Sequence, residues 1–370
     1  MSRAWADIDC RQWLKNLSAF TERVSPAMVM PVVKSDAYGL GARQAVKIFI
    51  RGGIKRIAVA TVEEARALAD LPVEIQFLGV PETDEIGEIV SNNWVGSVGD
   101  RQTADVFSAE AIKRNRSVRI HILIDTGMGR LGFLPSQACE EISRIAALPG
   151  IEVEGIYSHF PAAEKNDEFA IGQVKTMELL FDKLQQNAID IRHCHLANSY
   201  AIASLSVSFQ PPFTMVRPGI ELHGVSDKDG ATLPDIQPVL TLKSRLLSVR
   251  KLPRGSTIGY GRTFRLPDDS LVGTIPIGYA DGYPRSLSNV GEVLIRGRKC
   301  RVIGSVCMDY IQVALDNVPE VRKGEEVVLV GRQGKETIAL DELAVRAGTI
   351  TYDLLTGLGP RVERHYSDLK

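Results

Sequence analysis

The stretch AMVMPVVK at residues 27–34 decides the fold class, because it is an apolar, β-rich run that ends in a lysine. Seven similar runs follow it, at residues 56–61, 74–79, 95–99, 118–126, 152–160, 193–199 and 214–220. Amphipathic segments lie between them, such as residues 62–71, 136–148 and 167–187, and Ser136 is expected to cap the second of these helices. Eight strands, most of them followed by a helix-like segment, predict an α/β fold of the (β/α)8 or TIM-like barrel type.

The texture of the chain changes after about residue 237. Short Val- and Ile-rich runs, separated by Gly, Pro and Asp turns, then occupy residues 240–252, 271–277, 291–296, 299–306, 310–315 and 325–330, with one helical stretch at 340–347. This pattern is typical of a mainly antiparallel β domain. We therefore expect two domains, 1–237 and 238–370, with the first few residues packed on the second domain.

Composition indicates a small-molecule partner. Lys and Arg (44) nearly balance Asp and Glu (45), so no basic excess points to nucleic acid. No run reaches the roughly 18 apolar residues of a membrane span, and the N-terminal MSRAWADIDC has no apolar signal region. The five cysteines show no CxxC spacing, which indicates reduced thiols and a cytoplasmic protein.

Polar residues gather where the barrel strands are expected to end, and barrel enzymes build their sites from such ends. Lys34 closes the first run; it either lies in a desolvated place that makes its amine nucleophilic, or reaches the solvent at the rim. Ser199, Gly219 and Ile220 offer a hydroxyl and closely approaching N–H groups after strands seven and eight, where barrel phosphate sites commonly form. A lysine opposite a phosphate cradle, to which Tyr38 could add a phenol, is what a lysine-bound pyridoxal phosphate requires.

Two other interpretations of these strand ends are weaker. Gly127, Gly129 and Gly132 match the G-x-G-x-x-G dinucleotide fingerprint, but the match follows the fifth strand and four residues intervene before the next helix. His193 and His195 would share one face of a strand, yet no third metal ligand is evident nearby. We expect histidines that face the barrel interior, and no metal site.

The motifs together resemble bacterial alanine racemases of the fold-type III pyridoxal-phosphate class, essentially from end to end. The matching stretches are VKSDAYG (33–39), DTGMGRLG (125–132), SHF (158–160), ANS (197–199), VRPGI (216–220), GYG (259–261), PIGYADG (276–282) and VCMD (306–309), with Tyr352 and Arg361. The resemblance implies a pyridoxal 5'-phosphate-dependent racemase that interconverts L- and D-alanine. It also implies a homodimer whose active sites are shared between a barrel and the partner's β domain.

The resemblance assigns a role to each matching residue. Lys34 carries the cofactor and is the base on one face of the substrate, and Tyr260 of the other subunit is the base on the opposite face. Arg217 contacts the pyridine nitrogen, and His159 orients Arg217 or Tyr260. The other implied cofactor contacts are Tyr38, Asn198, Ser199, Gly219, Ile220 and Tyr352. The implied substrate contacts are Arg130 and the backbone of Met308, with Tyr279 at the mouth of the site.

The two proposed bases need a special environment. Lysine and tyrosine have solution pKa values of about 10, so the site must lower the pKa of at least one of them through burial or nearby cations. Three positions depart from the usual pattern of the family. Leu123 stands where many relatives have a carbamylated lysine that braces the carboxylate-binding arginine, Leu40 replaces a histidine, and His223 replaces a tyrosine.

These departures leave open a racemase that prefers serine or a broader set of amino acids. A non-catalytic pyridoxal-phosphate carrier is a further alternative, but such proteins lack the β domain that would supply Tyr260 and Met308. Whether D-alanine would serve cell-wall synthesis or amino-acid catabolism is also left open.

Overall fold

The predicted barrel is confirmed: eight parallel strands follow one another along the chain and close into a ring. The computed structural model describes residues 3–165, 168–227, 230 and 232–368. The barrel strands are β2 (Met28–Val29), β3 (Arg56–Val59), β4 (Glu74–Phe77), β5 (Gly96–Val98), β6 (Val118–Leu123), β7 (Ile151–Tyr157), β8 (His193–Asn198) and β9 (Met215–Arg217). Ladders join β2-β9-β8-β7-β6-β5 and β3-β4. Single bridges, Val32 to Ala58 and Gln76 to Val95, join these two groups and close the ring.

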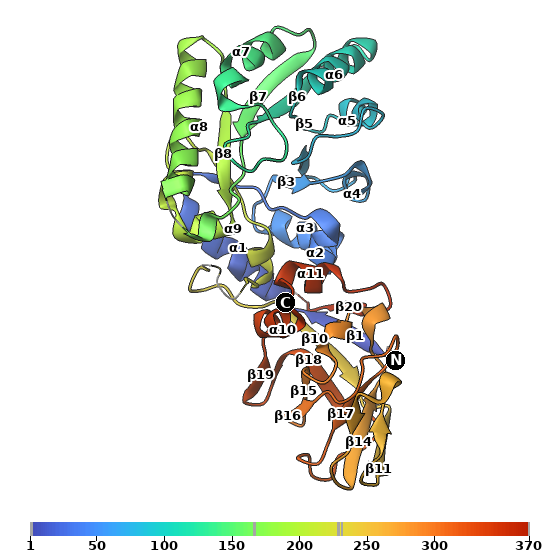
Figure 1. Cartoon of the computed structure of the whole chain (residues 1–370). Helices are drawn as coiled ribbons and strands as arrows, with labels where there is room; N and C mark the ends of the chain where they lie inside the picture. Colours follow the sequence, from blue (N-terminus) through green and yellow to red (C-terminus); the bar gives the residue numbers. More distant parts are fainter. Residues whose placement is uncertain (1–2, 166–167, 228–229, 231, 369–370) are drawn as a thin grey trace.

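Helices surround the ring because each buries one apolar face against it (Figure 1). They are α1 (Cys10–Val24), α3 (Ala42–Arg51), α4 (Val62–Arg66), α5 (Ile86–Ser91), α6 (Arg101–Lys113), α7 (Pro135–Ala146), α8 (Glu168–Gln186) and α9 (Ser199–Ser204). The expected cap at Ser136 is wrong. Leu134 is the N-cap of α7 without a side-chain hydrogen bond, and Pro135 occupies the first turn, where its missing N–H has no cost. Asp167, the first residue of the helix expected at 167–187, lies outside the described residues.

The first barrel strand is much shorter than expected. β2 ends at Val29, although Met30 and Val32 still donate backbone hydrogen bonds to Val216 and Pro218. Lys34 begins α2 (Lys34–Gly39), in which Ser35, Asp36, Ala37 and Tyr38 all have left-handed backbone angles, with φ between 52° and 56°. Such a run is costly for residues other than glycine, so its surroundings must hold it in place.

The second part of the chain is mainly antiparallel β structure, as predicted. A seven-stranded sheet contains β16-β15-β18-β10-β1-β20, with β19 beside β18, and a three-stranded sheet contains β11-β14-β17. Their bounds are β1 (Ala4–Ile8), β10 (Leu240–Arg245), β11 (Ser248–Leu252), β14 (Ser270–Ile275), β15 (Glu292–Ile295), β16 (Arg298–Arg301), β17 (Ile311–Ala314), β18 (Glu326–Gln333), β19 (Glu336–Ile338) and β20 (Glu363–Tyr366). A short pair, β12 (Thr257–Ile258) and β13 (Phe264–Arg265), completes the strands described. The single run expected at 240–252 is thus two strands in two sheets.

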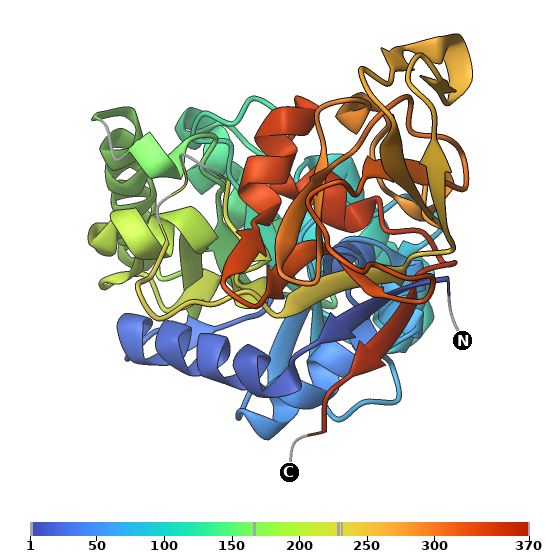
Figure 2. The ribbon, with the colours of Figure 1, turned by 90° about the horizontal axis from the view of Figure 1, so that it is seen from below.

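The two ends of the chain meet in the larger sheet. β1 pairs with β10 in antiparallel fashion and with β20 in parallel fashion, and Figure 2 shows β1 and β20 side by side. The expected helix at 340–347 is α10 (Leu340–Ala347), and α11 (Thr351–Thr356) follows it. The division of the chain at residues 237 and 238 stays a prediction. Within the described residues, no helix has the length and apolar character needed to cross a membrane.

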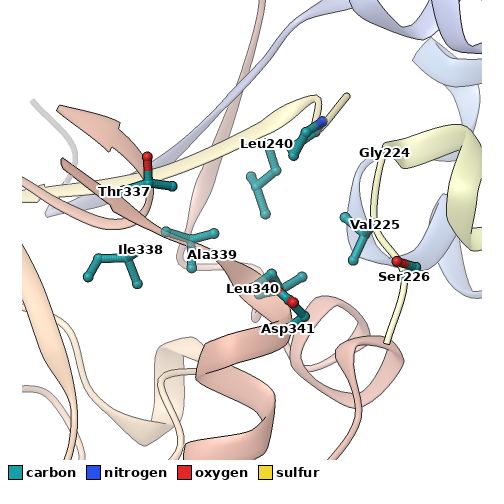
Figure 3. A pocket seen from close by; sticks show the side chains of 11 residues that line it. Gly224, Val225, Ser226, Leu240, Thr337, Ile338, Ala339, Leu340 and Asp341 are labelled. Carbon is teal, nitrogen blue, oxygen red and sulfur yellow. The ribbon is translucent and has the colours of Figure 1, made fainter. Parts of the chain in front are cut away.

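A small apolar cavity lies where the loop at residues 224–226, after the last barrel strand, meets the seven-stranded sheet (Figure 3). It measures about 200 Å³ and lies among Val225, Leu240, Ile338 and Leu340, which come from that loop, β10, β19 and α10. Its lining contains none of the residues that the sequence singled out for chemistry. We therefore regard it as packing space between the two parts of the chain.

Candidate functional site

A cavity of about 320 Å³ opens at the carboxyl ends of the barrel strands. Ten of the expected cofactor and substrate residues line it: Lys34, Tyr38, Arg130, His159, Asn198, Ser199, Arg217, Gly219, Ile220 and, from the second domain, Tyr352. Aliphatic side chains, among them Leu78, Leu123 and Leu131, form part of the wall. Tyr260, Tyr279 and Met308 are not among its lining residues. The fold thus gathers one half of the expected site and leaves the other half elsewhere on the chain.

Lys34 extends into this cavity from the start of α2. Burial by the surrounding protein lowers the pKa of its amine, Arg130 lowers it further, and Glu64 acts in the opposite direction. Glu64 also supports the left-handed turn that carries the lysine, because its carboxylate accepts the N–H of Ser35 at 2.6 Å and that of Ala60 at 2.8 Å. Lys34 thus lines the cavity but stays exposed to solvent in the single chain, and an amine with a lowered pKa is the better nucleophile near neutral pH.

Tyr38, Ser199 and Gly219 form a tight polar cradle across from Lys34. Ser199 Oγ accepts the N–H of Gly219 at 2.9 Å. A Cβ atom on Gly219 would lie only 2.2 Å from the hydroxyl of Tyr38, so glycine allows the phenol to reach this backbone. Burial raises the pKa of the Tyr38 hydroxyl, which therefore stays a hydrogen-bond donor. Hydroxyls and backbone N–H groups in one concave place suit a phosphate group.

Tyr352 reaches the cradle from the far end of the chain. Its ring packs edge-on against Tyr38, with centroids 5.9 Å apart. The start of α11 is held by Asp227, whose Oδ1 accepts both the N–H and the hydroxyl of Thr351 at 2.8 Å. The hydroxyl of Tyr200 hydrogen-bonds to Tyr352 and accepts the N–H of Asp227. These bonds explain how a residue 314 positions after Tyr38 comes to lie beside it.

Asn198 has a structural role as well as a place in the cavity wall. Its side chain caps α9 by accepting the N–H of Ala201 at 3.0 Å. The cap fixes the first residue of α9, which is Ser199, and so helps to place the hydroxyl of the cradle.

Arg217 lies at the end of β9 and is only 4% exposed. Its guanidinium donates to the carbonyl oxygens of Ser158 at 2.6 Å and Leu196 at 3.1 Å, and to His195 Nδ1 at 2.6 Å. Burial lowers its pKa to about 10, so it remains a cation at neutral pH. A buried cation with several fixed partners can direct a remaining N–H to one acceptor in the cavity.

His159 lies beside Arg217, but their contact is long, with 3.4 Å between Arg217 Nη2 and His159 Nδ1. Burial lowers the pKa of His159 to about 3, with further lowering by Arg217, Arg130 and Lys34. His159 is therefore neutral, and the positive charge at the site comes from Arg217 and Arg130. This positive field suits a phosphate and a carboxylate.

Arg130 lies in a turn built by glycines, which is not a dinucleotide-binding helix start. Asp125 Oδ1 accepts the N–H groups of Gly127 and Gly129, each at 3.0 Å. Gly132 has φ of 112°, and a Cβ there would lie 2.7 Å from the carbonyl oxygen of Leu123. The guanidinium of Arg130 makes no hydrogen bond or ion pair with any residue that the structure describes. Leu123, which is apolar, offers it no partner.

The two other departures from the family pattern are buried. His223 Nδ1 accepts the indole N–H of Trp13 at 2.9 Å, and its ring lies 5.3 Å from that of Tyr38. Leu40 is fully buried, and its carbonyl oxygen accepts the hydroxyl of Tyr366 at 3.0 Å. Both residues therefore support the turn behind Tyr38, and neither lines the cavity.

Three expected residues of the second domain, unlike Tyr352, lie on exposed segments. Tyr260 is 76% exposed, Met308 52% and Tyr279 44%. Backbone bonds from Tyr279 to Cys307 and from Ala280 to Met308 join two of these loops, and a Cβ on Gly278 would lie 2.3 Å from both acceptor oxygens. Arg361 links the same loops through Asp281 and Asp309. Large apolar side chains held rigidly at a surface are typical of an interaction site.

Several residues around Arg217 were not predicted for the site. Tyr157 lines the cavity and lies under Arg217, and His195, expected only as an interior histidine, contacts Arg217 directly. The position of Tyr157 at the end of β7 was the only local signal for it, and His195 lies within β8. His193 is half-buried and contacts Thr214. Within the described part of the chain, no group of three or more His, Cys, Asp or Glu side chains could hold a metal ion.

These residues fit a lysine-bound pyridoxal phosphate. The amine of Lys34 can form the covalent bond, the cradle closed by Gly219 can hold the phosphate, and Arg217 can donate to the ring nitrogen. The fit depends on the close approach of the Tyr38 hydroxyl to the backbone of Gly219, because a side chain at position 219 would occupy this space.

Comparison with known proteins identifies the family of the chain. The families described as "Alanine racemase, N-terminal domain" and "Alanine racemase, C-terminal domain" match residues 8–227 and 239–366. The alanine racemase of Halothermothrix orenii is 38% identical over 370 residues, covering 98% of this chain and 97% of its own. The alanine racemase of Clostridium difficile 630 superposes with a TM-score of 0.93 at 29% identity, over 100% of this chain and 97% of that one. The enzyme from Bartonella henselae with covalently bound pyridoxal phosphate superposes with a TM-score of 0.88 at 28% identity, over 99% and 100% of the two chains.

Proposed function

The chain belongs to the alanine racemase family, and on this premise we propose that it interconverts L- and D-alanine with pyridoxal 5'-phosphate, using Lys34 and the partner subunit's Tyr260 as the two bases. The observation that carries the proposal is the cavity that brings Lys34, the Gly219 cradle and Arg217 together. Curated relatives that are named alanine racemase match this chain over nearly their whole length.

Racemisation needs a proton removed from one face of Cα and another delivered to the opposite face. Bound pyridoxal phosphate supplies the electron sink that makes the Cα hydrogen acidic. Lys34, whose pKa is lowered in the cavity, is suited to accept or donate the proton at Nζ on its own face. The phenol of Tyr260 would serve the other face from a partner subunit.

Arg217 would hold the ring nitrogen of the cofactor without giving it a proton. A guanidinium only donates hydrogen bonds, and even the lowered pKa of about 10 keeps Arg217 protonated at neutral pH. The ring nitrogen would then accept a hydrogen bond and stay neutral, so the cofactor ring would withdraw electrons from the substrate less strongly. Tyr38, Ser199, Gly219, Ile220 and Tyr352 would hold the phosphate, and Asn198 would fix Ser199. His159 would help to orient Arg217.

A homodimer with shared sites accounts for the exposed loops. Tyr260, Tyr279 and Met308 are exposed and held in place, yet do not line their own chain's cavity. In the proposed head-to-tail dimer they complete the cavity of the partner subunit. Tyr279 would lie at its mouth, and the backbone of Met308 would join Arg130 in binding the substrate carboxylate. The cytoplasmic location predicted from the sequence belongs to the same proposal.

Alanine is the proposed preferred substrate, and serine or a broader set of amino acids is the second candidate. The observation that favours the second is the unpartnered guanidinium of Arg130 beside the apolar Leu123, because an unbraced arginine can meet the carboxylate of a larger substrate.

Chiral analysis of products tests the function. The cofactor-loaded protein is incubated separately with L-alanine, L-serine and L-lysine. We expect fastest formation of D-alanine and its loss in Lys34→Ala and in Tyr260→Phe, while both variants keep the far-UV circular dichroism of the wild type. Faster D-serine formation would transfer the proposal to the second candidate. Bound cofactor without any D-product would support a non-catalytic carrier instead.

A further inference from the structure

A chain of hydrogen bonds runs through the barrel interior behind Arg217. Arg217 Nη1 lies 2.6 Å from His195 Nδ1, and His195 Nε2 lies 2.8 Å from His121 Nδ1. His121 Nε2 in turn lies 3.0 Å from Glu154 Oε2. None of the four side chains is more than 4% exposed. Barrel interiors of this fold are ordinarily filled by branched apolar residues, so this continuous polar chain needs a reason.

Arg217 determines where the hydrogens of the chain lie. Because a guanidinium only donates, His195 Nδ1 must accept from Arg217, and the ring hydrogen of His195 is on Nε2. That Nε2–H then donates to His121 Nδ1, which leaves the hydrogen of His121 on its own Nε2. With both rings neutral, only this arrangement satisfies the three bonds.

Both histidines are neutral in the folded protein. Burial lowers the pKa of His121 to about 4, and burial together with Arg217 lowers that of His195 well below its ordinary value. The chain therefore has a cation at the cavity end, two oriented neutral rings, and a group that accepts at the far end.

Glu154 is held as a carboxylate at that far end, toward the amino ends of the strands. Arg56 donates to its two oxygens at 2.8 and 3.1 Å, and Arg119 donates at 3.3 Å. Although burial alone raises the pKa of Glu154, the bonds from His121 and Arg56 hold it well below its usual range. Every neighbouring group donates to Glu154, so a side chain that also donates would not fit there.

Tyr157 fixes the planes of the groups nearest the cavity. Its ring stacks on His195, with centroids 5.1 Å apart and 5° between the planes. The guanidinium of Arg217 lies 5.5 Å from the centroid of the same ring. Tyr157 is itself held by a 2.6 Å bond between its hydroxyl and that of Ser97.

We propose that Glu154 is a positioning residue that acts through His121 and His195 to hold the guanidinium of Arg217 in the orientation that aims it at the cavity. The inference rests on the proposed contact between Arg217 and the ring nitrogen of the cofactor. It adds that this contact depends on a carboxylate three hydrogen bonds away, which accepts the last hydrogen of the chain that Arg217 orders.

Neutron diffraction from deuterated crystals of the pyridoxal-phosphate-loaded enzyme at neutral pH tests the hydrogen positions without any substitution. We expect deuterium on Nε2 of both His121 and His195, and none on their Nδ1 atoms. Deuterium on Nδ1 of either ring, or on both nitrogens of one ring, would overturn the proposal.

A matched pair of variants tests the effect on the site. Glu154→Gln replaces the acceptor with a side chain that must point an NH2 group at His121 or Arg56. Glu152→Gln removes a half-exposed carboxylate of the same strand, which pairs with Arg192 instead. We expect Glu154→Gln to weaken pyridoxal phosphate binding about 10- to 100-fold, by analogy with the range seen when the hydrogen-bond partner of a metal-binding residue is lost, and to shift the absorption maximum of the bound cofactor. Glu152→Gln should leave both unchanged.

A purely structural role would give a different result: lower thermal stability of Glu154→Gln with an unaltered cofactor spectrum, which would contradict the proposal. The variant Arg217→Ala distinguishes failure of the inference about Glu154 from failure of the proposed function. If Arg217→Ala leaves the spectrum unchanged, the contact with the ring nitrogen is wrong. If Arg217→Ala shifts the spectrum and Glu154→Gln does not, only the inference about Glu154 fails.

Discussion

A methyl group on Gly219 would lie 2.2 Å from the hydroxyl of Tyr38, closer than non-bonded atoms can approach. At the scale of single residues, the phosphate cradle therefore depends on the absence of a side chain at one position. The neighbours cannot simply move away, because the ring of Tyr38 is buried between Tyr352 and His223.

We expect Gly219→Ala to weaken pyridoxal phosphate binding by at least about tenfold and to destabilise the apoenzyme by about 1–3 kcal/mol, the usual cost of overpacking. Fluorescence titration of the apoenzyme measures the first effect, and urea unfolding the second. Gly172→Ala is the control, because a Cβ there meets no atom within 4 Å. Unaltered cofactor binding in Gly219→Ala would show that the phosphate lies elsewhere.

At the scale of elements, the turn α2 that positions Lys34 has an unfavourable backbone conformation. Left-handed angles cost roughly 1–2 kcal/mol for each non-glycine residue, and four consecutive residues adopt them here. Hydrogen bonds to Glu64 and Asp36 and the burial of Ala37 and Tyr38 offset this cost. The same Glu64 is the acidic group that opposes the lowering of the Lys34 pKa.

Replacing Glu64 should therefore change the titration of Lys34. Removal of its negative charge in Glu64→Gln leaves burial and Arg130 unopposed, so the pKa of Lys34 is expected to fall further. The pH at which the apoenzyme lysine is half reactive toward an amine-acylating reagent, followed by mass spectrometry, should move to lower pH. Glu63→Gln, an exposed neighbour that pairs with Arg66, should cause no movement. A shift to higher pH in Glu64→Gln would contradict this account.

At the scale of the whole molecule, the proposed dimer divides each active site between two chains. Lys34→Ala and Tyr260→Phe should each be inactive alone, but a heterodimer of the two would contain one intact site. Refolding an equal mixture should therefore restore about a quarter of wild-type activity, as expected for random pairing in a two-fold dimer. Absence of recovery, with dimers present by sedimentation, would mean that both bases belong to the same chain.

Buried histidines should make the whole fold sensitive to acid. The pKa values of His121, His159 and His223 are lowered to about 4, 3 and 3, whereas unfolded histidines titrate near about 6.5. Below that pH the unfolded chain binds more protons than the folded one. The free energy of unfolding should then fall as pH decreases from about 6.5 to about 4, by about 1.4 kcal/mol per pH unit for each histidine.

Denaturant titrations across this pH window measure the slope. His223→Gln keeps an acceptor for the indole of Trp13 and removes one titrating ring. The slope of the unfolding free energy against pH should therefore be smaller by about 1.4 kcal/mol per pH unit, the contribution of one histidine. Equal slopes in the two proteins would show that His223 is not neutral in the folded state.

The sequence by itself determined the barrel, the β domain after it and the barrel half of the candidate site. Eight apolar runs with helical segments between them are a local signal, because burial imposes a residue period on each element separately. Although the first strand ends earlier than expected, Lys34, Ser199, Arg217 and Gly219 all lie at the expected edge of the barrel. The expected cap at Ser136 and the single strand at 240–252 were wrong, since neighbouring residues can support more than one boundary.

Only the tertiary structure decided which distant groups meet. Tyr352 reaches Tyr38 through a helix that the periodicity did not reveal, and the left-handed turn after Val33 is held by Glu64, 29 residues beyond Ser35. Arg56 and Glu154, 98 positions apart, form a buried pair that no local pattern indicates. The physical reason is that a buried charge must find its partner across the closed barrel, and ring closure, not sequence spacing, determines which side chains face one another inside it.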